Sequence, residues 1–505
     1  MTIERTRSDV GLRSERGPVL GAVMLCTALV AIDATILAAA VPAIVSDLGG
    51  FSQFPWLFSI YLLAQAVSVP IYGKLADAVG RKPVMVVGIS LFLVGSVLCG
   101  AAWTMPLLIG ARAVQGLGAG AILPMSMTIV GDIYTVEERA RVQGFIASVW
   151  GMASIVGPTL GGVFSEYLSW RWIFFVNLPV GALAAWMLTR HFHEHIERRR
   201  HRIDYAGASL LGVGCTLLIL ALLQGGHSWD WGSAVSITLL VTSAAMLVAV
   251  PFVERRAAEP ILPLWVFSRR VLVGANAASL LVGAILIGLT SYVPTFAQGV
   301  LGFGALLAGF ALAAMTIGWP IAAATAGRIY MRLGFRDTSL IGVAFIVLGA
   351  LLMLTVGESS SLWMIALFTF VVGIGLGYTA SPTLVAVQSV VGWDRRGVVT
   401  GTNMFARSVG SAVGVAVFGA IANASLGRQF ANPPSGIDGH LPTTADDAAL
   451  VLDPNSGAAP AVREFVRSAL AAATHHVFVG VAVLAVVMVA AVLLMPRRSE
   501  QLQFD

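Results

Sequence analysis

Three ionisable residues lie inside long apolar stretches of the sequence: Asp33, Arg112 and Arg407. Asp33 is the only acidic residue deep within such a stretch. A charged side chain in a segment that spans hydrocarbon is costly and is a functional hypothesis by default. Apolar surroundings favour the neutral carboxylic acid, whereas a cation within ~4–6 Å favours the carboxylate. Asp33 could therefore take up and release a proton, with Arg112 as the cation that tunes this exchange.

Long apolar segments must position these residues, because the composition excludes a soluble enzyme and a disordered chain. Of the 505 residues, 57% are hydrophobic and 11% are charged, against about 25% charged in an ordinary soluble protein. A helix that crosses ~30 Å of hydrocarbon needs about 20 mostly apolar residues. Fourteen runs meet this length: 18–45, 55–76, 83–102, 105–131, 141–166, 172–190, 205–224, 233–253, 271–296, 304–327, 338–356, 361–388, 399–423 and 476–495. The predicted fold class is an all-α integral membrane protein with 14 transmembrane helices.

The basic residues give this arrangement an orientation. Of the 31 lysines and arginines, 25 fall in the loops after even-numbered runs or in the two termini, and only four fall in the opposite loops. Because cytoplasmic loops are enriched in basic residues, both termini are expected in the cytoplasm. The net charge of +5 is spread over short clusters without a basic face, so a nucleic-acid partner is not expected.

Three segments fall outside the apolar pattern. Charged segments 191–204 and 254–270 bracket the seventh and eighth runs, and 424–475 is a long external loop. The expected organisation is therefore a tail (1–17), a six-helix bundle (18–190), linkers enclosing two extra helices (191–270), a second six-helix bundle (271–495) and a tail (496–505).

The two six-helix units resemble each other. Gly73 and Gly80 flank the loop after the second run, and Gly327 and Gly334 flank the loop after the tenth, at the same offset of 254 residues. Each unit also has alternate glycines in its fourth helix: Gly116, Gly118 and Gly120, and Gly373, Gly375 and Gly377. Repeats of this kind build transporters whose site lies between the halves, near the membrane midplane.

The depths of Asp33 and Arg112 allow the two side chains to meet. Asp33 is ~12 residues, or about 18 Å of helix, from the outer end of its span, and Arg112 is ~7 residues, or about 10 Å, from the same side. The difference of one to two turns is within reach of an arginine side chain. A proton-coupling pair and a static ion pair that fixes helix packing are both compatible with this geometry.

Five motifs in the first half of the chain carry a family resemblance. They are Ile32-Asp33-Ala-Thr35-Ile36 with Val41-Pro42; Gly73-x-x-x-Asp77-x-x-Gly80-Arg81-Lys82; Arg112-x-x-Gln115-Gly116-x-Gly118; Gly151 with Gly157-Pro158-x-x-Gly161-Gly162; and Trp170-Arg171-Trp172 through Asn177-Leu-Pro179-Val-Gly181. As a set they resemble the major facilitator superfamily, specifically its fourteen-helix drug:proton antiporters of the multidrug efflux type. One departure is Leu37-Ala38-Ala39-Ala40, where that family often has an asparagine.

The resemblance implies a proton-coupled exporter of amphipathic or cationic drugs and dyes that works by alternating access. It implies a bacterial inner membrane, a monomer, and no cofactor or metal. The residue roles that follow from it are proton coupling by Asp33 and Arg112; a conformational latch of Gly73, Asp77, Gly80, Arg81 and Lys82; and an antiporter motif of Gly157, Pro158, Gly161 and Gly162. Met331 stands where the second unit would have the latch acid, so the latch is expected to be asymmetric.

Polar and aromatic residues within the spans are candidates for a substrate path. They are Tyr61, Gln65, Gln115, Trp150, Asn276, Tyr292, Asn403 and Arg407. For each of them, packing or contact with lipid is an alternative, and Arg407 could also extend toward water at the membrane surface.

The sequence lacks the motifs of common enzymes and of metal sites. The sequence has no phosphate-binding glycine loop, no G-x-S-x-G turn and no H-E-x-x-H pair, which argues against an enzyme. The cysteines Cys26, Cys99 and Cys215 all lie in apolar runs, and the histidines at 191–201 fit a solvated linker better than a metal site. Two alternative functions remain: export of one envelope lipid or metabolite on the same fold, and a membrane sensor that transports nothing.

Overall fold

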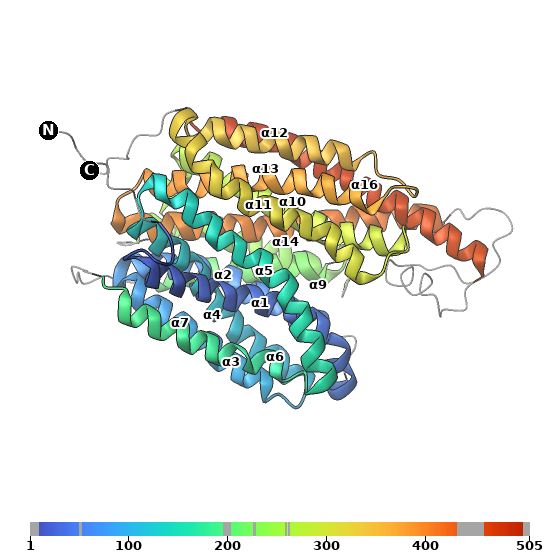
Figure 1. The fold of residues 1–505 in the computed structure, drawn as a ribbon, viewed down its shortest axis with the longest axis horizontal. Helices are drawn as coiled ribbons and strands as arrows, with labels where there is room; N and C mark the ends of the chain where they lie inside the picture. Colours follow the sequence, from blue (N-terminus) through green and yellow to red (C-terminus); the bar gives the residue numbers. More distant parts are fainter. Residues whose placement is uncertain are drawn as a thin grey trace.

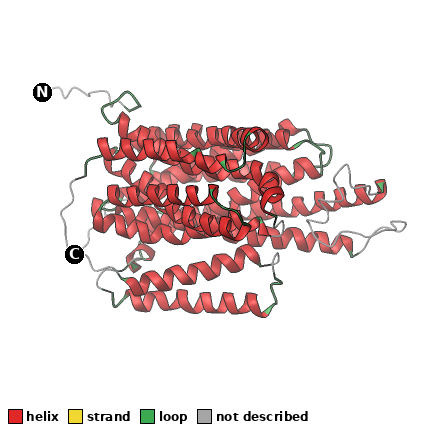
Figure 2. Cartoon of the chain, turned by 90° about the horizontal axis from the view of Figure 1, so that it is seen from below, coloured by secondary structure: helices red, strands yellow, loops and turns green. Residues whose placement is uncertain are grey.

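The computed structural model describes residues 10–49, 53–194, 204–225, 229–257, 260, 263–431 and 459–497. Within these residues the chain is built from helices that run roughly alongside one another (Figures 1 and 2). Thirteen helical segments in this part of the chain are long and apolar enough to cross a membrane, and a shorter apolar helix lies at Ala206–Leu222. Together they correspond to the fourteen predicted runs.

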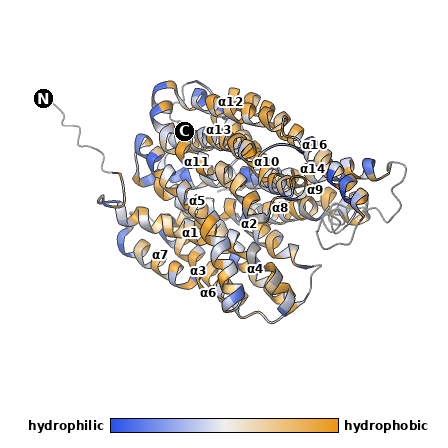
Figure 3. Ribbon diagram, turned by 45° about the vertical axis from the view of Figure 1, so that its right-hand side comes forward, coloured by the Kyte–Doolittle hydropathy of each residue, from blue (hydrophilic) through white to orange (hydrophobic). Residues whose placement is uncertain are grey.

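The helices have the following bounds: α1 (Gly17–Leu48), α2 (Pro55–Val79), α3 (Arg81–Gly100), α4 (Met105–Ile133), α5 (Val136–Tyr167), α6 (Trp172–Phe175), α7 (Asn177–His191), α8 (Tyr205–Gln224), α9 (Ala234–Glu254), η2 (Leu264–Phe267), α10 (Arg270–Gly299), α11 (Ala305–Leu333), α12 (Phe335–Met353), α13 (Leu362–Ser389), η3 (Trp393–Arg395), α14 (Arg396–Phe430) and α16 (Pro460–Leu493). The short α6 and α7 together form one membrane span. Hydrophobic residues dominate along the helices, and hydrophilic residues gather at the helix ends (Figure 3).

The predicted external loop at 424–475 is too wide. Helix α14 continues to Phe430 and α16 begins at Pro460, so both helices project beyond the rest of the bundle (Figure 1). The first turns of α16 carry Arg463, Glu464 and Arg467. Hydropathy detects the part of a helix that crosses hydrocarbon, not a charged extension into water. The middle of this predicted loop lies outside the described residues.

The helices pack as two groups. In the first, α1 packs on α5 and α7, while α4 packs on α2 and α3; in the second, α10 packs on α14 and α16, while α13 packs on α11 and α12. Helices α8 and α9 pair with each other, and α8 contacts α2 and α14. The two extra helices therefore lie beside the seam between α2 and α14.

The internal repeat is visible in the packing. Gly88 of α3 lies against the backbone of Gly118 in α4, and Gly342 of α12 lies against Gly375 in α13. Small residues let membrane helices approach closely without losing contact area. Both α2 and α11 end at a glycine with positive φ, Gly80 at 103° and Gly334 at 88°, a conformation that glycine adopts without the strain imposed by a Cβ atom.

Within the described residues, the two halves make their closest backbone contacts at one end of the molecule. We call this end the basic face, because Arg81, Lys82 and Arg396 lie there together with the start of α1 and the end of α16. At this face the backbones of Gly73 in α2 and Gly397 in α14 touch, and α5 packs along α11.

Away from the basic face the halves separate (Figure 1). On α5 the face that packs against α11 continues to Ile155, which is 60% exposed, and to Gly162, where an added Cβ would meet nothing within 4 Å. On α11 the corresponding face reaches Phe310, which is 57% exposed. The structure is thus closed at the basic face and open at the opposite one.

Candidate functional site

A buried polar network surrounds Asp33 in the first half. Its carboxylate accepts hydrogen bonds from Arg112 Nη1 at 2.7 Å, Gln115 Nε2 at 2.7 Å and Asn177 Nδ2 at 3.3 Å. Asp33 and Arg112 are each 1% exposed. The network therefore joins α1, α4 and α7 through one carboxylate, and its charge is balanced by a single guanidinium.

Neighbouring groups fix the orientation of the two α4 side chains. Arg112 also donates to the carbonyl of Leu57 at 3.1 Å and lies over the ring of Tyr61, 4.2 Å from its centroid. Gln115 donates to Ser96 Oγ at 2.9 Å, and Asn177 donates to the same oxygen at 3.3 Å. Because so many groups converge on this pair, protonation of Asp33 would remove the counter-charge of Arg112 and force the network to rearrange.

The antiporter-motif helix α5 packs directly beside this network. Thr35, two residues after Asp33, donates to the carbonyl of Ala153 at 2.9 Å. A Cβ added at Gly157 would lie 2.0 Å from Thr35 Oγ1. Gly161 is buried, whereas Pro158 is exposed. Gly157 is the motif residue that sets the distance between α5 and the part of α1 that carries Asp33.

The substitution Gly157→Ala is therefore expected to destabilise the packing of α5 on α1 and to disturb the Asp33 network, because α5 must move away from α1 or Thr35 must change rotamer. Overpacking of this kind costs about 1–3 kcal/mol. The matched control is Gly162→Ala, five residues further along α5, where the added methyl meets open space. The thermal unfolding midpoints of the two purified variants, compared with that of the parent, would contradict the interpretation if both variants behaved alike.

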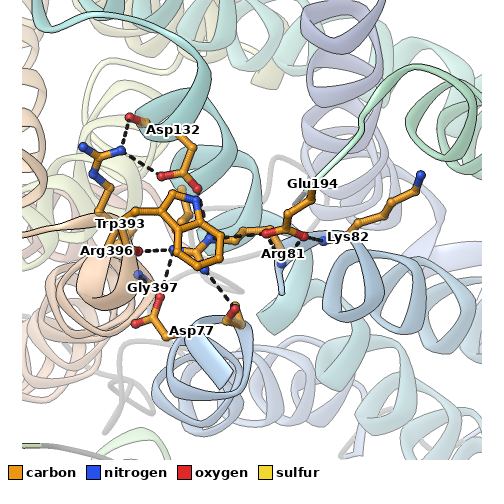
Figure 4. A network of polar contacts seen from close by, with 12 residues as sticks. Asp77, Arg81, Lys82, Asp132, Glu194, Trp393, Arg396 and Gly397 are labelled. Atoms are coloured by element: carbon orange, nitrogen blue, oxygen red, sulfur yellow. Dashed lines mark hydrogen bonds and ion pairs between the residues drawn. The ribbon is translucent and has the colours of Figure 1, made fainter. Parts of the chain in front are cut away.

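At the basic face, Asp77 joins the two halves. Its carboxylate accepts hydrogen bonds from the backbone N–H groups of Gly397 and Val398, each at 2.8 Å, and pairs with Arg81 at 3.0 Å. The two N–H groups belong to the first turn of α14, so the carboxylate also faces the positive end of that helix dipole. A residue of α2 thus caps a helix of the other half (Figure 4).

Arg81 extends the same junction. It is fully buried, pairs with Asp132 at 3.0 Å, donates to the carbonyl of Trp393 and lies 3.7 Å from the centroid of the Trp393 ring. Asp132 also pairs with Arg396 at 2.9 Å. Residues at the ends of α2, α3 and α4 therefore hold η3 and the start of α14 (Figure 4). We call Asp77, Arg81, Asp132, Trp393 and Arg396 the gate cluster.

The loop glycines and the first linker support the gate cluster. Glu194, just after α7, accepts from the backbone N–H groups of Arg81 and Lys82 at 2.9 to 3.1 Å and so caps α3. An added Cβ at Gly73 would lie 2.7 Å from the carbonyl oxygen of Gly397. Lys82 itself donates to the carbonyl of Thr189 and contacts only the first half in the described structure.

The equivalent junction in the second half has no acid at the position that matches Asp77. Met331 is 54% exposed, and α5 is capped by its own Thr135 and Glu138 in a capping box. Tyr330 Oη donates to the carbonyl of Val136 across the seam. The hydrogen bond that crosses the seam between α5 and α11 is therefore neutral, whereas the contact between α2 and α14 is charged.

The predicted substrate-path residues do not form one cluster. Tyr61 and Gln115 belong to the Asp33 network, and Asn403 donates to Asn276 Oδ1 at 3.2 Å. The Arg407 side chain has no hydrogen bond or ion pair with any residue that the structure describes. The remaining candidates are partly exposed: Gln65, Trp150 and Tyr292.

Several site residues were not predicted as such. Ser96 is a small polar residue in an apolar run and gives no signal of its own. Asn177 stood inside a motif without a role. Asp132, at the end of a span, and Trp393, in a loop with two arginines, could have been suspected from their positions at a membrane boundary. Among the described residues, no group of three or more His, Cys, Asp or Glu side chains could hold a metal ion.

This geometry defines a class of protein. Two six-helix units related by an internal repeat, with a buried charge pair in one unit, have the architecture of membrane transporters that are built from parallel repeats. The family comparison agrees: residues 23–415 match the model of the Major Facilitator Superfamily. The chain belongs to this superfamily, and it is a multi-pass membrane transporter, not an enzyme.

Individual relatives give the comparison more detail. Multidrug resistance protein 3 of Bacillus subtilis is 37% identical over 421 residues, which cover 83% of this chain and 82% of the relative. Multidrug transporter protein MdtP of the same organism is 34% identical over 83% of this chain and 78% of its own length. The solved structure of the human organic anion transporter MFSD10 (TETRAN) has a TM-score of 0.63 at 15% identity and covers 95% of this chain and 99% of its own. The last likeness concerns the fold alone.

Proposed function

We propose that this protein is a proton-coupled exporter of amphipathic or cationic small molecules in a bacterial inner membrane. The observation that carries the proposal is the fully buried Asp33–Arg112 pair at 2.7 Å, within a chain whose relatives include proteins named for multidrug resistance and multidrug transport. Ionisable residues inside a membrane mark proton and substrate pathways. Asp33 can bind and release a proton, and Arg112 is its counter-ion.

The orientation of the chain follows from the basic residues. Because cytoplasmic loops are enriched in arginine and lysine, we assign the basic face, with both termini, to the cytoplasm. The structure then represents the outward-open state. Both halves lie in one chain, so we propose that a monomer suffices.

The exchange can be derived from the two sites. In the outward-open state a proton reaching Asp33 neutralises the carboxylate and frees Arg112 from its ion pair, which loosens α1 against α4. Opening at the basic face requires the gate cluster to separate. Release of the proton to the cytoplasm restores the ion pair, and substrate taken up there is carried outward as the gate closes again.

The first test is ethidium efflux from cells that lack their main pumps. Cells making this protein are expected to extrude ethidium against its gradient, and a protonophore is expected to abolish that efflux. One elementary charge moved through 100 mV supplies about 2.3 kcal/mol. Efflux that survives the protonophore would contradict proton coupling. Absence of efflux at a normal membrane level would favour a single lipid or metabolite as the substrate.

A further inference from the structure

A cavity of about 440 Å³ lies where α5 and α11 meet at the basic face. It is separate from the Asp33 network and from the gate cluster. Its walls include Glu137 and Arg141 from the start of α5 and Arg328, Met331 and Arg332 from the end of α11. One half of the transporter supplies each wall, so a molecule bound here would bridge the two halves.

The charged groups in this cavity are free to bind a ligand. Arg141, Arg328 and Arg332 are exposed, and none of their side chains has a hydrogen bond or ion pair with another residue in the part of the chain that the structure describes. Glu137 is the carboxylate on the rim, so three guanidinium groups face one acid. Guanidinium groups bind phosphate oxygens in bidentate geometry, and the excess of two positive charges favours an anion.

The position of the cavity indicates where the anion comes from. Arg328 and Arg332 are one turn apart near the end of α11, and Arg141 is in the second turn of α5, at the boundary where the spans leave the membrane. On the membrane side of each wall an apolar side chain is exposed: Phe145, one turn after Arg141, and Ile321, two turns before Arg328. Charged groups next to exposed apolar side chains match the headgroup and the acyl chains of a lipid. A dissolved phosphate ion has no apolar group that would contact Phe145 and Ile321.

We propose that this cavity binds the phosphate headgroup of an anionic phospholipid from the adjoining leaflet. At the seam between α2 and α14, Asp77 forms a charged bridge between the two halves, whereas Met331 stands at the matching position in α11. The lipid phosphate supplies a charged bridge between α5 and α11 in place of that acid. Binding therefore stabilises the closed basic face. The inference uses the proposed orientation but not the proposed substrate or proton coupling.

The test is lipid binding by the full-length purified protein in a neutral detergent. Native mass spectrometry and the thermal unfolding midpoint would be measured with added phosphatidylglycerol, phosphatidylcholine and inorganic phosphate. Only phosphatidylglycerol is expected to stay bound and to raise the midpoint, since a ligand that binds the folded state alone stabilises it. Phosphatidylcholine carries the same phosphate with a balancing positive charge, and inorganic phosphate carries it without acyl chains.

Two triple variants of equal charge change make the test specific. R141Q/R328Q/R332Q is expected to weaken phosphatidylglycerol binding at least tenfold and to fold normally, because these side chains make no polar contacts within the described chain. R255Q/R256Q/R270Q removes three exposed arginines that lie outside the cavity and is expected to bind like the parent. R328Q alone, with a smaller loss, replaces the first triple if that fails to fold.

Four outcomes would overturn the proposal. Equal stabilisation by inorganic phosphate would make this a site for a free anion. Equal retention of phosphatidylcholine would remove the preference for anionic lipid. An equal loss in both triple variants would mean that general surface charge attracts the lipid. No binding of phosphatidylglycerol by the parent protein would remove the site altogether.

Discussion

The Asp33→Asn variant is expected to reach the membrane and to lose proton-driven efflux. Asparagine keeps the size of the side chain and can still bond Gln115 and Asn177, but it cannot bind and release a proton. Coupling free energies between two sites are typically about 1–3 kcal/mol, equivalent to a change of about 5- to 150-fold. We therefore expect uphill ethidium efflux to fall by at least about fivefold. Downhill exchange of the dye across the membrane of reconstituted vesicles is expected to continue.

Folding must be separated from coupling in this test, because the substitution leaves Arg112 buried without a counter-charge. Breaking a buried pair by removing one partner costs about 3–5 kcal/mol, whereas replacing both partners can be neutral. The double variant D33N/R112Q should therefore recover thermal stability and still fail to couple. As a control, D337N removes an acid in the first turn of α12 that pairs with Arg336 and is partly exposed. Full proton-driven efflux by folded D33N would show that the ion pair is a static packing element.

The Asp33–Arg112 contact could be predicted because the cost of buried charge and the depth of each residue along its helix are both properties of the sequence. The structure places the two side chains 2.7 Å apart. Ser96 and Asn177 could not be assigned in the same way. A serine or an asparagine in an apolar run is compatible with many positions around a helix. Only the packing of α3 against α4, and of α7 against α1 and α3, brings both residues into the Asp33 network.

The gate cluster shows a second limit. The loop motif that contains Asp77 is local and could be recognised, but its partners Gly397 and Val398 lie more than 300 residues away in the other half. These partners act through their backbone N–H groups, which every residue except proline has. No pattern in a single sequence therefore marks Gly397 and Val398 as the donors to the Asp77 carboxylate. For Trp393 the only signal was its position at a membrane boundary, where a tryptophan is common without any partner.

The internal repeat, in contrast, could be recognised in the sequence and again in the structure. The shared offset of Gly73 with Gly327 and of Gly80 with Gly334 predicted two related units, and the positive φ angles of Gly80 and Gly334 follow the same relation. The missing acid at Met331 predicted that the two junctions differ. Only the structure shows how the second junction is built without it, through Tyr330 and the capping box of α5.

Replacing Asp77 with alanine is expected to open the basic face. Asp77 is buried and accepts two backbone hydrogen bonds from α14, and a hydrogen bond to a charged group contributes about 1.5–3 kcal/mol. A net loss of about 2 kcal/mol from the outward-open state alone would shift the equilibrium toward the inward-open state by roughly 30-fold. Efflux should slow, because a gate that no longer closes cannot complete the cycle.

The shift can be measured as a distance across the basic face. Spin labels at R190C, on the first half, and L333C, on the second, would be placed in a background where the three buried cysteines are replaced by alanine. The Asp77→Ala variant should populate a longer distance than the parent. The matched control is D394N, an acid at the same face whose side chain is 70% exposed, since an exposed ion pair contributes little. If D77A and D394N gave the same distance distribution as the parent, the cap on α14 would not hold the gate, and the closed state would have to depend on the close packing of Gly73 against Gly397 instead.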